Sequence, residues 1–351
     1  MAKHNCSNFS LLFFGESGII EKISEEVGKV RSIEICAGAG GQALGLEQAG
    51  FRHVALIEID PAACATLRHN RPKWNVLEGD VKSFSAKKYV GIDLLAGGVP
   101  CPPFSVAGKQ LGQEDERDLF PEALRLVREC HPKAVMLENV RGLFDPKFKE
   151  YREHIKGQLE ALGYDCKWEP VQTHHYGVPQ LRPRALLIAL QKGYAPYFIW
   201  PLGVVAPPPT IGQLLQNEMA SNGWEGAAAW AEQANDIAPT IVGGSKKHGG
   251  ADLGPTRAKQ AWAKLGVDGM GIADEAPEKG FEGMPRLTVK MAALVQGFPP
   301  EWEFVGKRTP AYRQVGNAFP PPVAKAMGIA IRKALQAGAK NNHKNAEDLA
   351  G

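Results

Sequence analysis

The feature that most constrains the fold is an alternation of short apolar runs with helix-length amphipathic stretches between residues 30 and 195. The apolar runs end in glycine, aspartate or proline and occupy residues 32–36, 54–59, 92–96, 134–137 and 185–190. Runs of this kind are typical of buried strands. Strands that alternate with helices indicate an α/β fold, so we expect a doubly wound, mostly parallel sheet with a Rossmann-like arrangement of helices.

This regularity stops beyond residue 195, where three prolines at 207–209 and five glycines between 243 and 254 interrupt any period. A chain of 351 residues is long enough for two domains. Helical periodicity returns at 288–295 and 323–335, and a polar, frayed end follows from residue 336. We therefore predict an N-terminal extension (1–29), a first domain (30–195), a smaller irregular domain (196–285), a return to the first domain (286–340) and a flexible tail (341–351).

Composition excludes several classes of protein. The net charge of +3 does not by itself indicate a polyanionic partner. The six cysteines contain no C-x-x-C pair, so we expect neither a zinc site nor a disulfide framework, and no metal. No apolar run reaches the roughly 18 residues that span a bilayer, and no secretory signal opens the chain. We expect a cytoplasmic monomer with no membrane partner.

A glycine-rich turn, Gly38-Ala39-Gly40-Gly41, lies directly between the first expected strand and a helix, where small residues let a ligand approach the backbone. Glu58 ends the next strand, twenty residues after Gly38, and a carboxylate there can accept hydrogen bonds from a ribose. An adenosine-containing cofactor is expected. On these residues alone, a nicotinamide dinucleotide site fits equally well, and a plain tight turn is a further alternative.

Cys101 stands between two prolines in a glycine-bounded loop that follows the apolar run 92–96. Ligands bind at this carboxyl edge in open α/β sheets, whereas a structural thiol would usually lie inside a strand. The run 134–137 delivers Glu138 to the same edge, so a carboxylate can face the thiol. Arg182 and Arg184 open the run 185–190, and their alternate spacing places both on one face. A solvated charged edge is the alternative for the arginines.

Taken together, these motifs resemble the cytosine-5 DNA methyltransferase family of bacterial restriction–modification systems. The match follows the family's order from about residue 32 to residue 324. It comprises the glycine-rich turn, Glu58, Asp80, Pro100-Cys101, Glu138-Asn139-Val140, Gln180-x-Arg182-x-Arg184, Arg286-Leu287-Thr288, Gln296-Gly297-Phe298-Pro299 and the run YRQVGNAFP at 312–320. So many motifs in one order are very hard to obtain by chance.

The resemblance implies that the Cys101 thiolate adds to C6 of a cytosine, because C5 is otherwise a poor nucleophile. Glu138 would engage N3 as an acid, which requires burial to raise its pKa. Arg184 would hold O2 of the cytosine, and Arg182 would support Arg184 or bind a phosphate. Loss of the C5 proton and elimination of Cys101 then give 5-methylcytosine.

The resemblance also implies S-adenosylmethionine as methyl donor and S-adenosylhomocysteine as product. Glu58 would bind the ribose, Asp80 the adenine amino group, and Asn317 the methionine end. The full predicted set is Cys36, Gly38, Ala39, Gly40, Gly41, Glu58, Ile59, Asp80, Val81, Pro100, Leu119, Asn317 and Ala318. The chain departs from the family at Cys36 and Ile59, where aromatics are common, at Pro102 in place of glutamine, and at Met291 in place of glutamate. None of these changes removes a reacting group.

Duplex DNA is the expected partner, and the target base must leave the stack to reach a thiolate. The stretch 105–116 is a candidate mobile loop, with an ordinary connecting loop as the alternative. The irregular domain is expected to recognise the target, because its residues 245–264 hold five basic side chains and one acid amid glycines. A solvated loop is the alternative there. The predicted DNA-binding residues are Ser105, Lys109, Thr240, Ser245, Lys246, Lys247, His248 and Arg257, with Ile241 facing the same partner.

Three rival functions differ in residues or substrate. An RNA methyltransferase on the same architecture would share the chemistry and differ in the nucleic acid. A dehydrogenase is disfavoured by the proline-cysteine pair and by Glu138-Asn139-Val140. A catalytically inactive DNA-binding relative is disfavoured by the presence of Cys101, Glu138 and both arginines.

Overall fold

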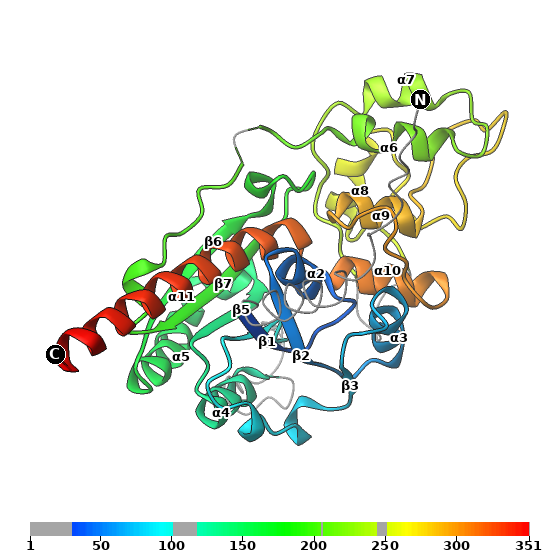
Figure 1. Cartoon of the computed structure of the whole chain (residues 1–351). Helices are drawn as coiled ribbons and strands as arrows, with labels where there is room; N and C mark the ends of the chain where they lie inside the picture. The colour runs from blue at the N-terminus through cyan, green and yellow to red at the C-terminus, as the bar shows by residue number, and fades with distance from the viewer. Residues whose placement is uncertain (1–29, 101–117, 205, 244–250, 351) are drawn as a thin grey trace, which may run out of the picture.

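The computed structural model describes residues 30–100, 118–204, 206–243 and 251–350. Its centre is a seven-stranded sheet in the order β3-β2-β1-β4-β5-β7-β6 (Figure 1). The strands are β1 (Val30–Ile35), β2 (Phe51–Glu58), β3 (Val76–Glu78), β4 (Leu94–Gly97), β5 (Ala134–Val140), β6 (Tyr164–Gln172) and β7 (Pro183–Gln191). The first five are parallel and β7 is antiparallel to both its neighbours. The doubly wound, mostly parallel sheet expected from the sequence is confirmed.

Helices cover both faces of this sheet. On one face α4 (Phe120–Cys130) and α5 (Lys149–Ala161) contribute Phe120, Leu124 and Leu159 to a hydrophobic cluster. On the other face α2 (Gly41–Gln48) and α11 (Pro321–Ala350) pack against the sheet. Helix α3 (Pro61–Asn70) follows β2, and Asp60 caps it by accepting a hydrogen bond from the Ala62 amide. The expected helix 323–335 is confirmed, but α11 continues through residues 336–350, where the sequence had predicted a frayed tail.

Residues 206–243 and 251–306 form what we call the small lobe, at the upper right of Figure 1. Its helices are α6 (Ile211–Ala220), α7 (Ala227–Gln233), α8 (Thr256–Ala263) and α9 (Val289–Val295). They pack around a second hydrophobic cluster that contains Trp224, Trp230 and Trp262. Helix α9, which the sequence assigned to the return to the first domain, contributes Met291 and Val295 to this same cluster. Helix α10 (Arg308–Asn317) lies between the small lobe and the sheet.

Met291 has a local role at the start of α9. Its amide donates to the Thr288 hydroxyl over 3.2 Å, and the Thr288 amide lies 3.4 Å from the Met291 sulfur. The pair is a capping box in which a thioether replaces the usual carboxylate. Within the described ranges no helix is long and apolar enough to cross a membrane.

Candidate active site

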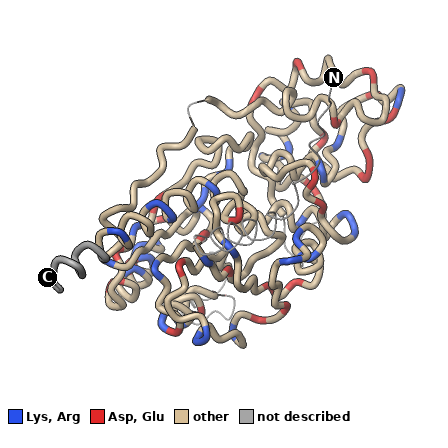
Figure 2. The backbone as a smooth tube through the Cα atoms, in the orientation of Figure 1, with Lys and Arg blue, Asp and Glu red and all other residues tan. Residues whose placement is uncertain are grey.

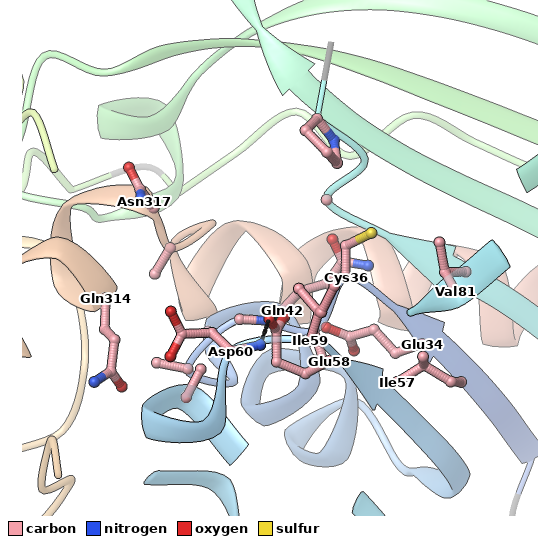
Figure 3. Close-up of a pocket in the computed structure, with 18 of the residues that line it drawn as sticks. Glu34, Cys36, Gln42, Ile57, Glu58, Ile59, Asp60, Val81, Gln314 and Asn317 are labelled. Carbon is pink, nitrogen blue, oxygen red and sulfur yellow. Dashed lines mark hydrogen bonds between the residues drawn. The ribbon is translucent and has the colours of Figure 1, made fainter. Parts of the chain in front are cut away.

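A cavity of about 760 Å³ opens at the carboxyl ends of the parallel strands and is closed on its far side by α10 (Figure 3). Every predicted cofactor-binding residue lines it, with the exception of Gly40. Gly40 instead begins α2 with a φ of 88°, and a Cβ there would meet the Leu67 side chain at 2.7 Å. Gly40 thus supplies the left-handed backbone of the turn, and its part in cofactor binding stays a prediction.

Glu58 organises the glycine-rich turn. Its two carboxylate oxygens accept hydrogen bonds from the Gly38 amide at 2.7 Å and the Asp60 amide at 2.8 Å. The side chain is buried and lines the cavity, whereas Asp80, at the start of a short 3₁₀ turn, is exposed at the cavity's edge. Two carboxylates thus face one space from successive strand ends, as the parallel sheet requires.

Two buried polar side chains of the cavity wall were missed by sequence reasoning. Glu34 on β1 and Gln42 on α2 are 1% and 3% exposed. The Oε2 atom of Glu34 and both polar atoms of the Gln42 amide have no hydrogen-bond partner among the described residues. Burial raises the pKa of Glu34 well above its usual range. A buried polar group without a partner is costly, so these atoms are placed to receive a polar ligand. The available signal was Glu34, a charged residue inside the apolar run 32–36.

Glu138 reaches the same cavity from the end of β5. It forms an ion pair with Arg184 of β7, with Arg184 Nε 2.9 Å from Glu138 Oε1, and both side chains are buried. Burial raises the pKa of the Glu138 carboxyl, while the positive charges of Arg184 and Arg182 oppose the rise. The direction expected from the sequence is confirmed. Glu138 is thus favoured in its protonated form compared with an exposed glutamate.

The chain that leads to the predicted nucleophile lines this cavity at Gly98 and Pro100. Cys101 itself lies outside the described residues, but Pro100, directly before it, lines the cavity. The side-chain amide of Asn139 donates to the Val99 carbonyl over 2.8 Å and so fixes the chain just before Pro100. The two adjacent residues on β5 therefore have different roles. Glu138 faces the cavity, and Asn139 fixes the segment that follows β4.

Arg182 does not reach the cavity. It is 1% exposed and donates to the backbone carbonyls of Ile241, Gly316 and Ala318. Of its two predicted roles, the contact with a phosphate is disfavoured because its donors are directed at main-chain oxygens inside the protein, and the support of Arg184 stays a prediction. The spacing placed Arg182 and Arg184 on one side of the strand, but it could not reveal that another segment covers the first of them.

The arrangement joins a nucleotide-sized cavity lined by acids to a buried carboxyl of raised pKa and an arginine. Among the described residues no cluster of three His, Cys, Asp or Glu side chains could hold a metal ion. Such a site can bind a ligand that carries hydroxyl and amino groups. It can also donate a proton to a basic group beside that ligand.

The sequence matches the model of the C-5 cytosine-specific DNA methylases over residues 30–333. The chain belongs to this family. The methylase is 58% identical over 308 residues to the type II methyltransferase M.NgoMIV of Neisseria gonorrhoeae, covering 87% of this chain and 98% of that protein. It is also 58% identical over 309 residues to M.NaeI of Lentzea aerocolonigenes, covering 86% of this chain and 75% of that one. The enzyme is thus a DNA (cytosine-5-)-methyltransferase of the restriction–modification type.

Solved structures share the fold of the methylase. The DNMT2 of Spodoptera frugiperda superposes with a TM-score of 0.61 at 16% identity, and covers 86% of this chain and 99% of its own. The Dnmt2 methyltransferase of S. pombe superposes with a TM-score of 0.59 at 18% identity, and covers 88% and 99%. At these identities the likeness extends to the fold.

The predicted DNA-binding residues of the methylase are only partly described. Ser105, Lys109, Ser245, Lys246, Lys247 and His248 lie outside the described residues. Thr240 is half-buried and its hydroxyl donates to the Leu181 carbonyl, whereas Arg257 is exposed on the first turn of α8. Ile241 is fully buried, so the expectation that its side chain faces DNA is wrong. Charges of both signs are spread over the two lobes, with acidic residues on outer loops of the small lobe (Figure 2).

Proposed function

We propose that the enzyme transfers the methyl group of S-adenosylmethionine to C5 of a cytosine extruded from duplex DNA, through a covalent adduct between Cys101 and C6. The observation that carries this proposal is that Glu138, which is paired with the buried Arg184, and Pro100 line one cavity of nucleotide size. It places an acid, a cation and the entry of the cysteine loop beside one another.

The residues of the cavity fit the donor. Glu58 offers carboxylate oxygens to ribose hydroxyls, and Asp80 to the adenine amino group. The unpartnered atoms of Glu34 and Gln42 suit the ammonium and carboxylate of an amino acid, because an acid and an amide offer an acceptor and a donor. Asn317 and Ala318 close the cavity from α10 and the turn after it. S-adenosylmethionine supplies an electrophilic methyl group on a sulfonium.

The protein's own side chains perform the remaining steps. The Cys101 thiolate forms a bond to C6 and the C5–C6 electron pair moves toward N3, where Glu138 gives its proton. Arg184 would orient Glu138 and hold O2 of the base. C5 then carries the electron density that takes up the methyl group. A base removes the proton from C5, the C5–C6 double bond re-forms as the C6–S bond breaks, Cys101 leaves as the thiolate, and N3 returns its proton to Glu138.

The small lobe is proposed to recognise the target sequence. Exposed Arg257 and the stretch 244–250 with its basic side chains would contact the duplex, together with Thr240, Ser105 and Lys109. Protection of DNA from a partner restriction nuclease is the proposed biological role, as the names of the similar proteins suggest. A monomeric state and a cytoplasmic location remain proposals, which sedimentation and cell fractionation would test.

Methyl transfer to nucleic acid tests the substrate directly. Tritium from labelled S-adenosylmethionine should enter unmethylated duplex genomic DNA and should not enter transfer RNA assayed in parallel. Incorporation into RNA alone would overturn the duplex DNA proposal in favour of the RNA methyltransferase. Absence of transfer to either would favour the inactive relative.

A trapping experiment tests the nucleophile. The substrate is duplex DNA of genomic sequence in which 5-fluorocytosine replaces cytosine. C5 of 5-fluorocytosine has no proton to lose, so the covalent adduct should accumulate and survive denaturing electrophoresis. Cys101→Ser should abolish the adduct, and Cys166→Ser, on edge strand β6, should leave it intact. An adduct in the Cys101→Ser variant would refute the assigned nucleophile.

A further inference from the structure

A segment of the small lobe, residues 238–243, lies on the stretch 179–182 that precedes β7. Gln180 and Ala238 form a parallel bridge, and the Leu181 amide donates to the Ala238 carbonyl over 2.7 Å. The Thr240 hydroxyl donates to the Leu181 carbonyl. This segment leads directly into the predicted DNA-binding stretch, so its position sets where that stretch begins.

The Arg182 guanidinium joins this segment to the wall of the cavity. Nη1 donates to the Ile241 carbonyl at 2.7 Å, and Nη2 donates to the Gly316 carbonyl at 2.7 Å and the Ala318 carbonyl at 3.2 Å. Gly316 and Ala318 flank Asn317, which lines the cavity. One rigid fork of donors therefore holds two segments that are far apart in the sequence.

Two buried glutamines complete the connection. Gln180 accepts a hydrogen bond from the Ile241 amide at 2.9 Å and donates to Gln296 Oε1 at 2.6 Å. Gln296 in turn donates to the Ala318 carbonyl. Both glutamines are fully buried. The Ile241 peptide is thus held on both its amide and its carbonyl side, and the same network ends at the cavity wall.

The two segments are also in direct contact. A Cβ on Gly243 would lie 2.4 Å from Asn317 Oδ1 and 2.8 Å from the Arg313 carbonyl. A Cβ on Gly316 would lie 2.3 Å from the Gly243 backbone. The two backbones are thus packed so closely that neither glycine position admits a methyl group without displacing its neighbour.

We infer that Arg182, with Gln180 and Gln296, is a positioning group that makes the segment 240–243, which leads into the predicted DNA-binding stretch, and the cavity wall 316–318 move as one unit, so that DNA and the methyl donor bind with positive coupling. The inference rests on the proposed function, since it takes the cavity as the donor site and the small lobe as the DNA site. By thermodynamic linkage the coupling is reciprocal, and each ligand strengthens the other by the same factor.

A purely structural role explains this placement less well. A buried guanidinium is costly to desolvate, and a well-packed apolar side chain of similar volume would often stabilise a core at least as well. Arg182 has no carboxylate within its hydrogen bonds, and its described acceptors are the Gln180 side chain and carbonyls of two separate segments. The arginine fixes the position of segment 240–243 relative to segment 316–318.

The test is a thermodynamic cycle with two ligands. One is S-adenosylhomocysteine, and the other is a short DNA duplex that contains the sequence methylated by the enzyme. The coupling factor is the Kd for S-adenosylhomocysteine without DNA divided by the Kd at saturating DNA. For the wild type we expect a factor of about 5 to 150, the usual range for coupled sites. Arg182→Lys keeps the charge but cannot span three carbonyls, and its factor should fall to about 1–2.

Gly243→Ala perturbs the same contact without entering the buried network, and it decides the outcome if Arg182→Lys fails to fold. Its factor should also fall to about 1–2, since the added methyl group separates residue 243 from Asn317. Gly157→Ala on α5, where a Cβ meets nothing within 4 Å, is the matched control and should keep the wild-type factor.

The outcomes separate this inference from the proposed function. A wild type that binds both ligands with a coupling factor of 1, or variants that keep the wild-type factor while losing thermal stability, would overturn the inference and leave the function standing. A wild type that binds neither S-adenosylhomocysteine nor duplex DNA would overturn the proposed function itself.

Discussion

Acidification should weaken the fold through one buried histidine, His53 on β2. Its ring nitrogens lie 2.9 Å from the Ser32 hydroxyl on β1 and 2.9 Å from the Ala43 carbonyl on α2, and the side chain is buried. Burial lowers the pKa of His53 from 6.5 to about 4. The folded protein therefore resists a proton that the unfolded chain accepts near pH 6.5.

The magnitude follows from that difference. Each pH unit between the two pKa values corresponds to about 1.4 kcal/mol, so the full contribution is about 3 kcal/mol. It is present above pH 6.5 and is lost as the pH falls toward 4, because only the unfolded state binds the proton in that window. Between pH 7 and pH 5 the free energy of unfolding should fall by about 2 kcal/mol from His53 alone.

Urea denaturation of the wild type and of His53→Gln at pH 7 and pH 5 measures this contribution. The glutamine cannot titrate and still carries an amide that can reach the Ala43 carbonyl, so it should lose about 2 kcal/mol less than the wild type over the same interval. Gly157→Ala on α5, which changes no titratable group, is the control and should match the wild type. Equal pH dependence in the wild type and His53→Gln would show the reasoning to be wrong.

Three further predictions concern the cavity. Glu138→Gln should lower kcat by about 10²- to 10⁴-fold, because the raised pKa keeps a proton on Glu138 and an amide cannot donate one in its place. The loss of rate at high pH should also become flatter in this variant, and a pH–rate profile measures it. Gly41→Ala puts a Cβ 2.2 Å from the Phe319 carbonyl and should lower the free energy of unfolding by about 1–3 kcal/mol, measured by denaturation against Gly157→Ala. Asn139→Ala leaves the Val99 carbonyl without its donor and should lower the free energy of unfolding by about 1–3 kcal/mol. It should reduce kcat more than it reduces the affinity for S-adenosylhomocysteine, and an unchanged kcat would contradict this prediction.

Sequence reasoning located the cavity because the fold does much of the positioning. In a parallel sheet every strand exit lies at one edge, so the acids found after successive apolar runs had to face a common space. Glu58 and Glu138 follow this rule, and both line the cavity. Five strands were found by their apolar runs. The edge strand β3 was missed because it has only three residues, and the edge strand β6 was missed because charged residues occupy every second position from 165 to 169 and Pro170 follows them.

What the sequence could not supply was the environment of individual side chains. Arg182 and Arg184 look equivalent in the motif, yet one pairs with Glu138 and the other is enclosed by the Ile241 and Gly316 peptides. The enclosing segments come from about 60 and 130 residues away, and no local pattern encodes such a contact. Gln42 was missed for the related reason that its position in a helix says nothing of the cavity beside it.

The direction of β7 has a consequence for how this enzyme is assembled. Arg184 stands at the beginning of its strand, and the antiparallel register sets it opposite Val140, next to the exit that carries Glu138. In a parallel strand the same residue would emerge at the opposite edge, a full strand length from the cavity. The β6–β7 pair therefore supplies the cation of this site, since the five parallel strands carry the acids Glu34, Glu58 and Glu138. With β7 reversed, Glu138 would lie buried at the end of β5 without the arginine that now balances its charge.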